Sequence, residues 1–302
     1  MDLLTPTFLL GLLLAVGIGV SLGLLGGGGS ILTVPILVYV LGLETHHAIA
    51  MSLLVVGTTS VTALIPHARG GRVRWKTGAL FGLTSMVGAY SAGRVAHYIP
   101  PTALLVAFGV MMLVTSVAMM RKKASPPAND QVEGTLPQLP VGKIIAEGLA
   151  VGAVTGLVGA GGGFLVVPAL VLLGRLPMGH AVGTSLLVIA MKSYAAFAGY
   201  LSKVEVDWTV ALLVTVAAVA GSFVGGGLAG RIAQETLRKV FAWFIVVMSA
   251  FILVQEVPRA LGMEFSMKTH WPWVLGAVAV PLVAAIISMA RERPATLARG
   301  RA

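Results

Sequence analysis

A single lysine, Lys192, lies deep inside a long apolar segment. It follows His180 by twelve residues, which in a helix places it about 18 Å from the start of that segment. An ionisable side chain at such a depth indicates a function and needs a partner of opposite charge. All eleven carboxylates fall in expected loops or near helix ends, so we predict that a bound anion supplies the counter-charge. The alternative is that Lys192 extends to a polar interface or stays neutral.

Two glycine-rich runs could provide a second element of an anion site. The run Gly26–Pro35 returns 133 residues later as Gly159–Pro168, and no gap is needed to align the flanks. Of the 53 aligned pairs that begin at Gly23, 21 are identical, against about a tenth expected by chance in so biased a composition. The chain therefore contains an internal duplication. Glycine-interrupted apolar segments at matching places in two halves are typical of transporter substrate sites.

A helix that begins directly after either glycine run would present unpaired backbone N–H groups and the positive end of its dipole. Two such ends that meet from opposite faces would bind an anion near the membrane midplane. Pro35 and Pro168 predict that neither following helix is uninterrupted. The predicted lining residues are Gly27, Gly28, Gly29, Ser30, Gly161, Gly162 and Gly163.

The alternative for these glycines is that they only let helices cross closely. A nucleotide-binding loop is disfavoured, because neither run ends in the Gly-Lys-Ser/Thr sequence that holds phosphate and magnesium.

A polar stripe recurs in the apolar segment that follows each run. Ser52 and Thr59 are seven residues apart, as are Ser185 and Lys192, so each pair lies on one helical face. We predict that both stripes face the substrate. The alternative is that the hydroxyl groups bond to carbonyl groups of their own helix, as is common in apolar helices.

Three histidines are candidates for coupling protons to transport. His47 and His180 occupy equivalent positions before the polar stripes, and His67 lies near the end of its segment. A structural or interfacial role is the alternative. The scarcity of buried carboxylates argues against a cation transporter and against an Asp/Glu proton relay. No arrangement resembles a nucleophilic triad or a metal cluster, so we predict neither an enzyme nor a bound metal or cofactor.

Composition identifies the class of protein that must position these residues. Apolar residues make up 57% of the chain, charged residues 11%, and the mean hydropathy is +0.94, whereas about a quarter of a soluble domain is charged. We therefore predict an all-α integral membrane protein. The net charge of +10 does not indicate nucleic-acid binding, because the basic residues lie mostly in short loops beside the expected spans. The first residues lack the basic start of a secretory signal, so we expect them to be retained.

Each copy of the repeat consists of five hydrophobic pieces. They cover residues 7–25, 30–41, 47–67, 77–98 and 102–120 in the first copy, and 144–158, 163–173, 181–201, 209–230 and 237–254 in the second. The second piece of each copy is too short to span a bilayer, so we expect it to form a hairpin with the first, turning at the glycines. The predicted organisation is a first membrane repeat at 1–120, a cytoplasmic linker at 121–142, a second repeat at 143–256, and an extra C-terminal transmembrane helix with a basic tail at 257–302.

Loop charges predict how the two copies are oriented. Four basic residues lie between the third and fourth pieces of the first copy, namely Arg69, Arg72, Arg74 and Lys76. The equivalent loop of the second copy has little positive bias, since it contains Lys203, Glu205 and Asp207. Placing the first loop in the cytoplasm also puts there the later basic clusters, which lie within residues 121–123, 231–239 and 291–301. The positive-inside rule therefore favours two inverted-topology repeats, with the N-terminus external and the C-terminus cytoplasmic.

The chain resembles the sulfite exporter TauE/SafE family of membrane permeases. The resemblance rests on the twin runs Gly26–Pro35 and Gly159–Pro168, and further on Ser52-Leu53, Thr184-Ser185-Leu186, Val73-Arg74-Trp75 and Val206-Asp207-Trp208. It implies a small-anion permease linked to sulfite, sulfonate or related sulfur metabolism in bacteria. The extra C-terminal span departs from the pattern, although members vary in segment count. A related thiosulfate-permease family uses cysteines along its path, and this chain has none.

Together these patterns predict a secondary transporter in the bacterial inner membrane that binds a small oxyanion, with sulfite or an organosulfonate as the favoured substrate. A carrier of carboxylates or other small anions is the first alternative, and a membrane-embedded enzyme or assembly factor is the second. The predicted partners are the anion and the lipid bilayer, with a homodimer as a candidate assembly and no nucleic acid.

Overall fold

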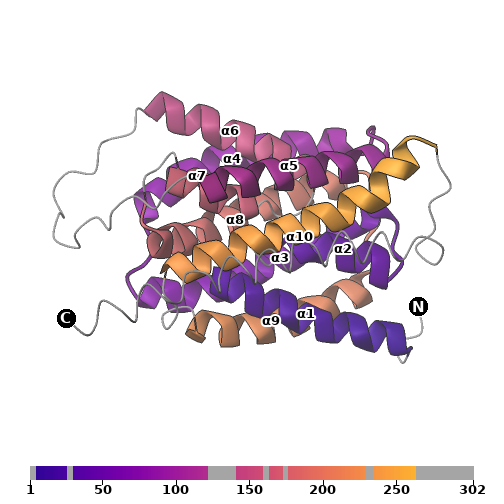
Figure 1. Ribbon diagram of the computed structural model, residues 1–302, viewed down its shortest axis with the longest axis horizontal. Coiled ribbons are helices and arrows are strands. Elements are labelled where there is room, and N and C mark those ends of the chain that lie inside the picture. Colours follow the sequence, from indigo (N-terminus) through magenta and orange to yellow (C-terminus); the bar gives the residue numbers. More distant parts are fainter. Residues whose placement is uncertain are drawn as a thin grey trace.

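The computed structural model describes residues 5–25, 30–121, 141–158, 163–172, 176–228 and 234–262, and regular secondary structure within those ranges is helical (Figure 1). The first copy of the repeat forms α1 (Pro6–Leu25), α2 (Ser30–Pro35), η2 (Ile36–Val40), α3 (Thr45–Arg69), α4 (Trp75–Ala96) and α5 (Pro101–Arg121). The second forms α6 (Val141–Val158), α7 (Gly163–Leu172), α8 (Met178–Leu201), α9 (Trp208–Leu228) and α10 (Gln234–Ala260).

Length and composition make this an integral membrane protein. Five of the described helices are long and apolar enough to cross a membrane, namely α1, α3, α8, α9 and the part of α10 from Ala242. Helices satisfy every backbone hydrogen bond internally, which the hydrocarbon interior requires. All ten predicted pieces are helical. The extra span predicted near residues 271–290 lies outside the described residues, as does most of the linker.

The short second pieces of the two copies, α2 with η2 in the first copy and α7 in the second, are called here the first and second short arms. Proline affects the two short arms differently. In the first copy α2 ends at Pro35 and the chain continues as η2, a π-helical turn. In the second copy α7 continues through Pro168 without a break, so the predicted interruption is wrong there. Proline removes a single backbone donor, and the neighbours Val167 and Ala169 are buried, so packing holds this arm in one helix.

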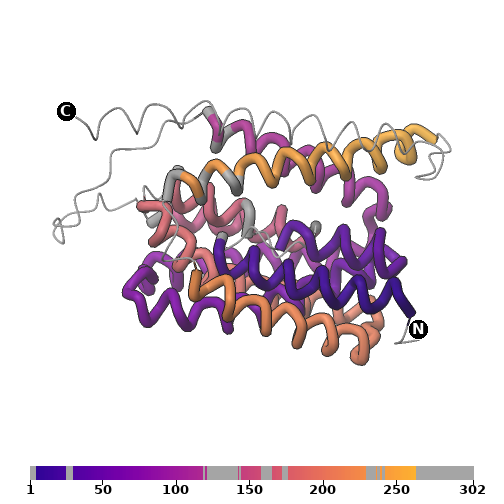
Figure 2. Tube along the Cα trace, turned by 60° about the horizontal axis from the view of Figure 1, so that its bottom comes forward, coloured from indigo at the N-terminus to yellow at the C-terminus, as the bar shows by residue number. Residues whose placement is uncertain are grey.

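Helices from the two copies pack against one another throughout the bundle. α4 lies against α6 and α8, whereas its equivalent α9 lies against α1 and α3. α3 packs on α8 in the middle of the molecule, and α5 packs along α10 (Figures 1 and 2). The contact of α4 with α6 thus corresponds to that of α9 with α1, and the contact of α4 with α8 corresponds to that of α9 with α3.

Glycine allows the tightest of these crossings. A Cβ on Gly19 would overlap the carbonyl oxygen of Ala218 where α1 crosses α9. A Cβ on Gly152 would overlap the carbonyl oxygen of Ser85 where α6 crosses α4. Gly152 and Gly19 are separated by the repeat offset, and so are Ala218 and Ser85. The two crossings therefore use equivalent positions, as small residues do at close helix contacts in membranes.

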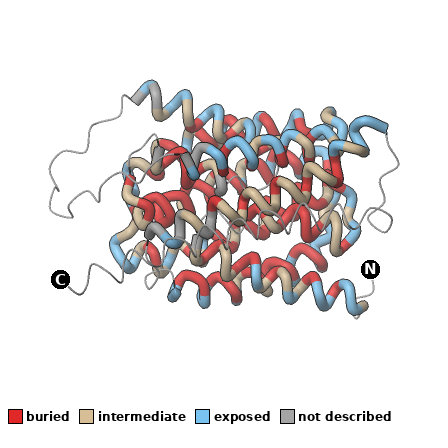
Figure 3. Tube along the Cα trace, viewed as in Figure 1, coloured by how far each residue is buried: buried red, intermediate tan, exposed pale blue. Residues whose placement is uncertain are grey.

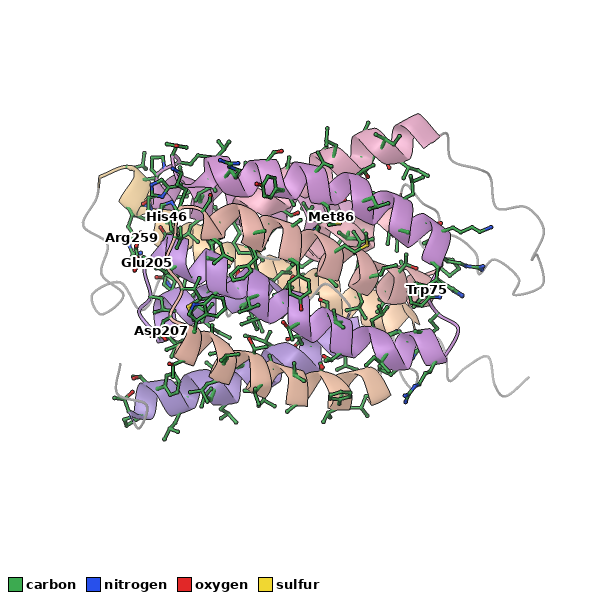
Figure 4. The ribbon with its side chains drawn as sticks, turned by 180° about the vertical axis from the view of Figure 1, so that it is seen from behind. His46, Trp75, Met86, Glu205, Asp207 and Arg259 are labelled. Carbon is green, nitrogen blue, oxygen red and sulfur yellow. The ribbon has the colours of Figure 1, made fainter. Side chains whose placement is uncertain are left out.

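Buried residues line these interfaces and exposed apolar residues face outward (Figure 3). Leu13 on α1, Val87 on α4 and Val216 on α9 are each at least 60% exposed, which fits a lipid-facing surface. Figure 4 places Trp75, at the start of α4, at one end of the bundle and Asp207, just before α9, at the other. The equivalent helices α4 and α9 therefore begin at opposite ends.

Candidate functional site

Lys192 is buried in the interior of α8. The residue is 1% exposed, and its Nζ donates a hydrogen bond of 2.9 Å to Oγ1 of Thr155 on α6. Within the described part of the chain no carboxylate pairs with it. An ammonium has three hydrogen-bond donors, and Thr155 accepts one. In the ammonium form, the charge of Lys192 would therefore not be balanced by any described side chain.

The contact with Thr155 brings Lys192 to the last turn of α6. Thr155 lies one turn before residue 159, where that run begins. In the same region the hydroxyl group of Tyr200 donates a hydrogen bond of 2.7 Å to the carbonyl oxygen of Leu157. Two hydrogen bonds from α8, one from Lys192 and one from Tyr200, thus hold the last turn of α6.

The first copy has a comparable contact. Nε2 of His67 lies 3.1 Å from the carbonyl oxygen of Gly23, in the last turn of α1. A carbonyl oxygen only accepts, so Nε2 carries the hydrogen. His67 is equivalent to Tyr200 by the repeat offset, and the two side chains contact the last turns of the equivalent helices α1 and α6.

The glycines predicted to bind the anion, Gly27, Gly28, Gly29, Gly161 and Gly162, lie outside the described residues. The residues that follow them begin the two short arms. Ser30, fully buried, is the first residue of α2, and Gly163 is the first residue of α7.

The hydroxyl groups of the predicted polar stripes bond within their own helices. Ser52 donates to the carbonyl oxygen of Ile49 at 2.7 Å, and Thr59 donates to that of Val55 at 2.6 Å. Ser185 donates to the carbonyl oxygen of Val182 at 2.8 Å. These bonds use the hydroxyl hydrogens, as the alternative interpretation expected. In this conformation the three groups could only accept hydrogen bonds from a ligand.

Two serines that the prediction omitted occupy the adjacent positions. Ser60 follows Thr59 and Ser193 follows Lys192; both are fully buried, and neither hydroxyl has a hydrogen-bond partner within the described part of the chain. A Cβ on Gly57 would lie 3.4 Å from Cβ of Ser193, which places Ser193 at the crossing of α3 and α8. Leaving a buried donor unsatisfied costs about 1–3 kcal/mol. The identity of Ser60 and Ser193 at the repeat offset is the sequence signal that could have found them.

The other two predicted coupling histidines lie at helix starts. His47 is in the first turn of α3, where its Nδ1 is 2.7 Å from Oε2 of Glu44. His46 also contacts Glu44, at 3.2 Å, and this hydrogen bond is the main reason that the pKa of Glu44 lies below its usual value. His180 is half-buried in the first turn of α8. Because α3 and α8 run in opposite directions, the structure does not bring His47 and His180 together.

One carboxylate contradicts the expectation that every acid is solvated. Glu256 lies in the last turns of α10, as predicted, but is only 1% exposed. Its Oε1 accepts hydrogen bonds from the hydroxyl group of Tyr39 at 2.7 Å and from Nη1 of Arg259 at 2.9 Å. The argument against a carboxylate that binds protons therefore no longer holds. Among the described residues no group of three or more His, Asp or Glu side chains could hold a metal ion.

Comparison with known proteins gives a consistent relationship. A family model described as sulfite exporter TauE/SafE matches residues 11–252, from α1 into α10. A probable membrane transporter protein of Xylella fastidiosa is 34% identical over 239 residues, which cover 78% of this chain and 91% of that protein. The probable membrane transporter protein YunE of Bacillus subtilis is 30% identical over 256 residues, covering 76% and 89%. A probable membrane transporter protein of Methanocaldococcus jannaschii is 27% identical over 263 residues, covering 82% and 96%.

No solved structure matches the chain. The family match extends over both glycine runs, Lys192 and the helices that surround them. The chain belongs to the sulfite exporter TauE/SafE family.

Proposed function

We propose that this protein is a secondary permease for a small oxyanion, with sulfite or an organosulfonate as substrate and Lys192 as its counter-charge. The observation that carries the proposal is the burial of Lys192 against the last turn of α6, which precedes the second glycine run in the sequence, with a hydroxyl group as its described partner. A buried charge without a partner is strongly unfavourable. A bound anion would supply the missing charge.

The surroundings of Lys192 suit an oxyanion in particular. A sulfite or sulfonate group has three oxygen atoms that accept hydrogen bonds from several directions. Lys192 has two N–H donors beyond the one that Thr155 accepts, and the unpartnered hydroxyl group of Ser193 is its neighbour. The first turn of α7, which begins at Gly163, offers backbone N–H groups and a positive dipole end. These donors would replace the hydration of the anion inside the membrane.

We propose further that the two copies are inverted repeats in the inner membrane, with the N-terminus external and the C-terminus cytoplasmic. The opposite starting ends of α4 and α9 and the exchange of packing partners between copies support this arrangement. Arg72 and Arg74 precede α4, and acidic residues precede α9, so the positive-inside rule assigns the two ends. An additional C-terminal span near residues 271–290 remains part of the proposal.

The test is transport by purified protein in liposomes, with sulfite, an alkylsulfonate and acetate as substrates. Lys192→Met keeps most of the side-chain length and removes the charge. It should weaken sulfite binding about 100-fold, because a desolvated charge partner is worth a few kcal/mol. Lys192→Arg should retain part of the binding, and Lys203→Met, in the exposed loop after α8, should match the parent protein.

Three outcomes would contradict the proposal in different ways. Unchanged sulfite binding in Lys192→Met would show that Lys192 does not hold the anion. Transport of acetate in preference to sulfite would replace the substrate with a carboxylate. A parent protein that moves none of the three anions would favour an enzyme or an assembly factor.

A further inference from the structure

The first short arm is attached to α10 through one buried polar contact. Tyr39, on η2, donates its hydroxyl hydrogen to Oε1 of Glu256 at 2.7 Å, and the edge of its ring meets Phe251 with the ring centroids 5.5 Å apart. Arg259 donates to the same oxygen from one turn further along α10, and its side chain is 44% exposed. A buried carboxylate thus connects the arm to a cation near the protein surface.

The arm that carries Tyr39 has an irregular backbone. η2 is a π-helical turn between Pro35 and Gly42, and Gly42 has a positive φ of 69°. π-helical turns are rare and are often found at functional sites. The equivalent arm, α7, is α-helical throughout, and the sequence places Leu172 at the position of Tyr39. Only the first arm therefore carries the phenol needed for such a contact.

The chemistry of this contact links docking of the arm to protonation of Glu256. A phenol donates to an ionised carboxylate more strongly than to a protonated one, so the docked arm favours the charged form. The two equilibria are reciprocal, and proton binding must therefore favour release of the arm by the same free energy.

Among the described elements packed on α10, few other ionisable groups can affect the protonation of Glu256. Tyr39 faces Glu256 from η2 and Arg259 faces it from α10 itself. Of the other elements packed on α10, α2 has no ionisable side chain and α5 has only Arg121, at its far end. α8 contributes His180, in its first turn, and Lys192, which bonds to Thr155. The other end of α8 precedes Glu205, which Figure 4 places at the same end of the bundle as Arg259.

We propose that Glu256 is a proton-binding site and that its contact with Tyr39 is a latch that the proton opens. A proton from water binds the carboxylate, the hydrogen bond from Tyr39 weakens, and η2 moves away from α10. Loss of the proton restores the carboxylate and docks the arm again. Resting on the anion permease proposed above, this site makes the proton the second transported species, so that each opening of the first arm is coupled to proton uptake.

The latch can be tested by a distance measurement that needs no anion. Because the chain has no cysteine, spin labels can be attached at introduced cysteines alone. Spin labels at Val40→Cys on η2 and Leu261→Cys just beyond α10 would report the distance between arm and helix by double electron–electron resonance. In the parent background a population with a longer distance should grow as the pH is lowered from about 8 to about 4, which approaches the ordinary range of a glutamate side chain. In Glu256→Gln the distribution should be the same at every pH. In Tyr39→Phe, which keeps the carboxylate but removes the donor, the longer distance should be present at every pH.

The matched control is Glu205→Gln, which removes an exposed carboxylate at the same end of the molecule (Figure 4) and should keep the pH response of the parent. An equal pH response in Glu256→Gln and in the parent would overturn the latch, and so would a parent distribution that does not change with pH.

Coupling is tested by sulfite uptake into liposomes with and without an inward proton gradient. Glu256→Gln should still exchange sulfite across the membrane but lose the accumulation that the gradient drives. Gradient-driven accumulation in Glu256→Gln equal to that of the parent would overturn the coupling. Absence of sulfite transport in the parent would instead overturn the proposed permease, and the distance measurement would still decide whether the latch exists.

Discussion

At the end of α1 a histidine ring holds the carbonyl oxygen of Gly23, and at the end of α6 a phenol holds that of Leu157. The two holding residues, His67 and Tyr200, are equivalent in the duplication, and both lie in the last turns of a central helix. Two different side chains thus hold a carbonyl oxygen just before each glycine run, although Leu157 is one residue beyond the equivalent of Gly23. The duplication has preserved the position of the donor residue, while its chemistry and the carbonyl group that it holds have diverged.

The buried lysine, in contrast, is present in one copy only. Lys192 corresponds to Thr59, and its partner Thr155 corresponds to Leu22. Neither Thr59 nor Leu22 is charged, and Thr59 donates a hydrogen bond within its own helix. The scaffold is therefore shared by the two copies, whereas the proposed anion contact lies in the second copy and the proposed proton latch joins Tyr39 of the first copy to Glu256 of the second.

The strongest test of the shared scaffold is at the glycine crossings. Gly19→Ala and Gly152→Ala each place a methyl group on a carbonyl oxygen of the crossing helix. Each should destabilise the protein by about 1–3 kcal/mol, because overpacking forces the helices apart. Thermal unfolding in detergent would measure the two effects.

Gly17→Ala is the matched control, since no atom lies within 4 Å of a Cβ at that position. It should leave the melting temperature equal or slightly higher, given the better helix propensity of alanine. Unequal losses at Gly19 and Gly152 would show that the two crossings are not energetically equivalent.

Much of this scaffold could be predicted from the sequence, because the repeat offset fixes which residues are equivalent and the apolar pieces fix the helices. Burial of Lys192 followed from its depth in an apolar segment. The burial of Glu256 did not, because a position near a helix end is usually solvated, and its partner Tyr39 is 217 residues away in the chain. Contacts of that kind depend on how the short arms pack, which periodicity does not specify.

A smaller effect should distinguish the two bonds at the helix ends. Tyr200→Phe removes only the hydroxyl group and should destabilise the protein by about 1 kcal/mol, the usual net value of a hydrogen bond. His67→Phe removes the equivalent bond and should cost a similar amount. Tyr98→Phe, at an exposed position, is the control and should have no effect. If only one of the two substitutions lowers the melting temperature, the other bond does not stabilise its helix end.

The smallest effect concerns the starts of the two central helices. Glu44 precedes α3 and its equivalent Pro177 precedes α8, with nearly identical backbone angles, φ −60° and ψ 143° against φ −55° and ψ 146°. Of these two preceding residues only Glu44 has an ionisable side chain, and the hydrogen bond from His46 holds the pKa of Glu44 below its usual value.

A carboxyl group with a lowered pKa in the folded state stabilises the protein above its unfolded-state pKa and loses that contribution as the pH falls through the folded-state value. Because Glu44 is mostly exposed, solvent screening limits the contribution to about a few tenths of a kcal/mol. Glu44→Gln should therefore lower the melting temperature slightly at pH 7, and the difference from the parent should vanish as the pH falls below the ordinary glutamate range near about 4.3. Glu205→Gln provides the comparison at the same end of the bundle. A Glu44→Gln difference that persists unchanged at low pH would show that this side chain acts through packing at the start of α3, and that its charge does not distinguish the two helix starts.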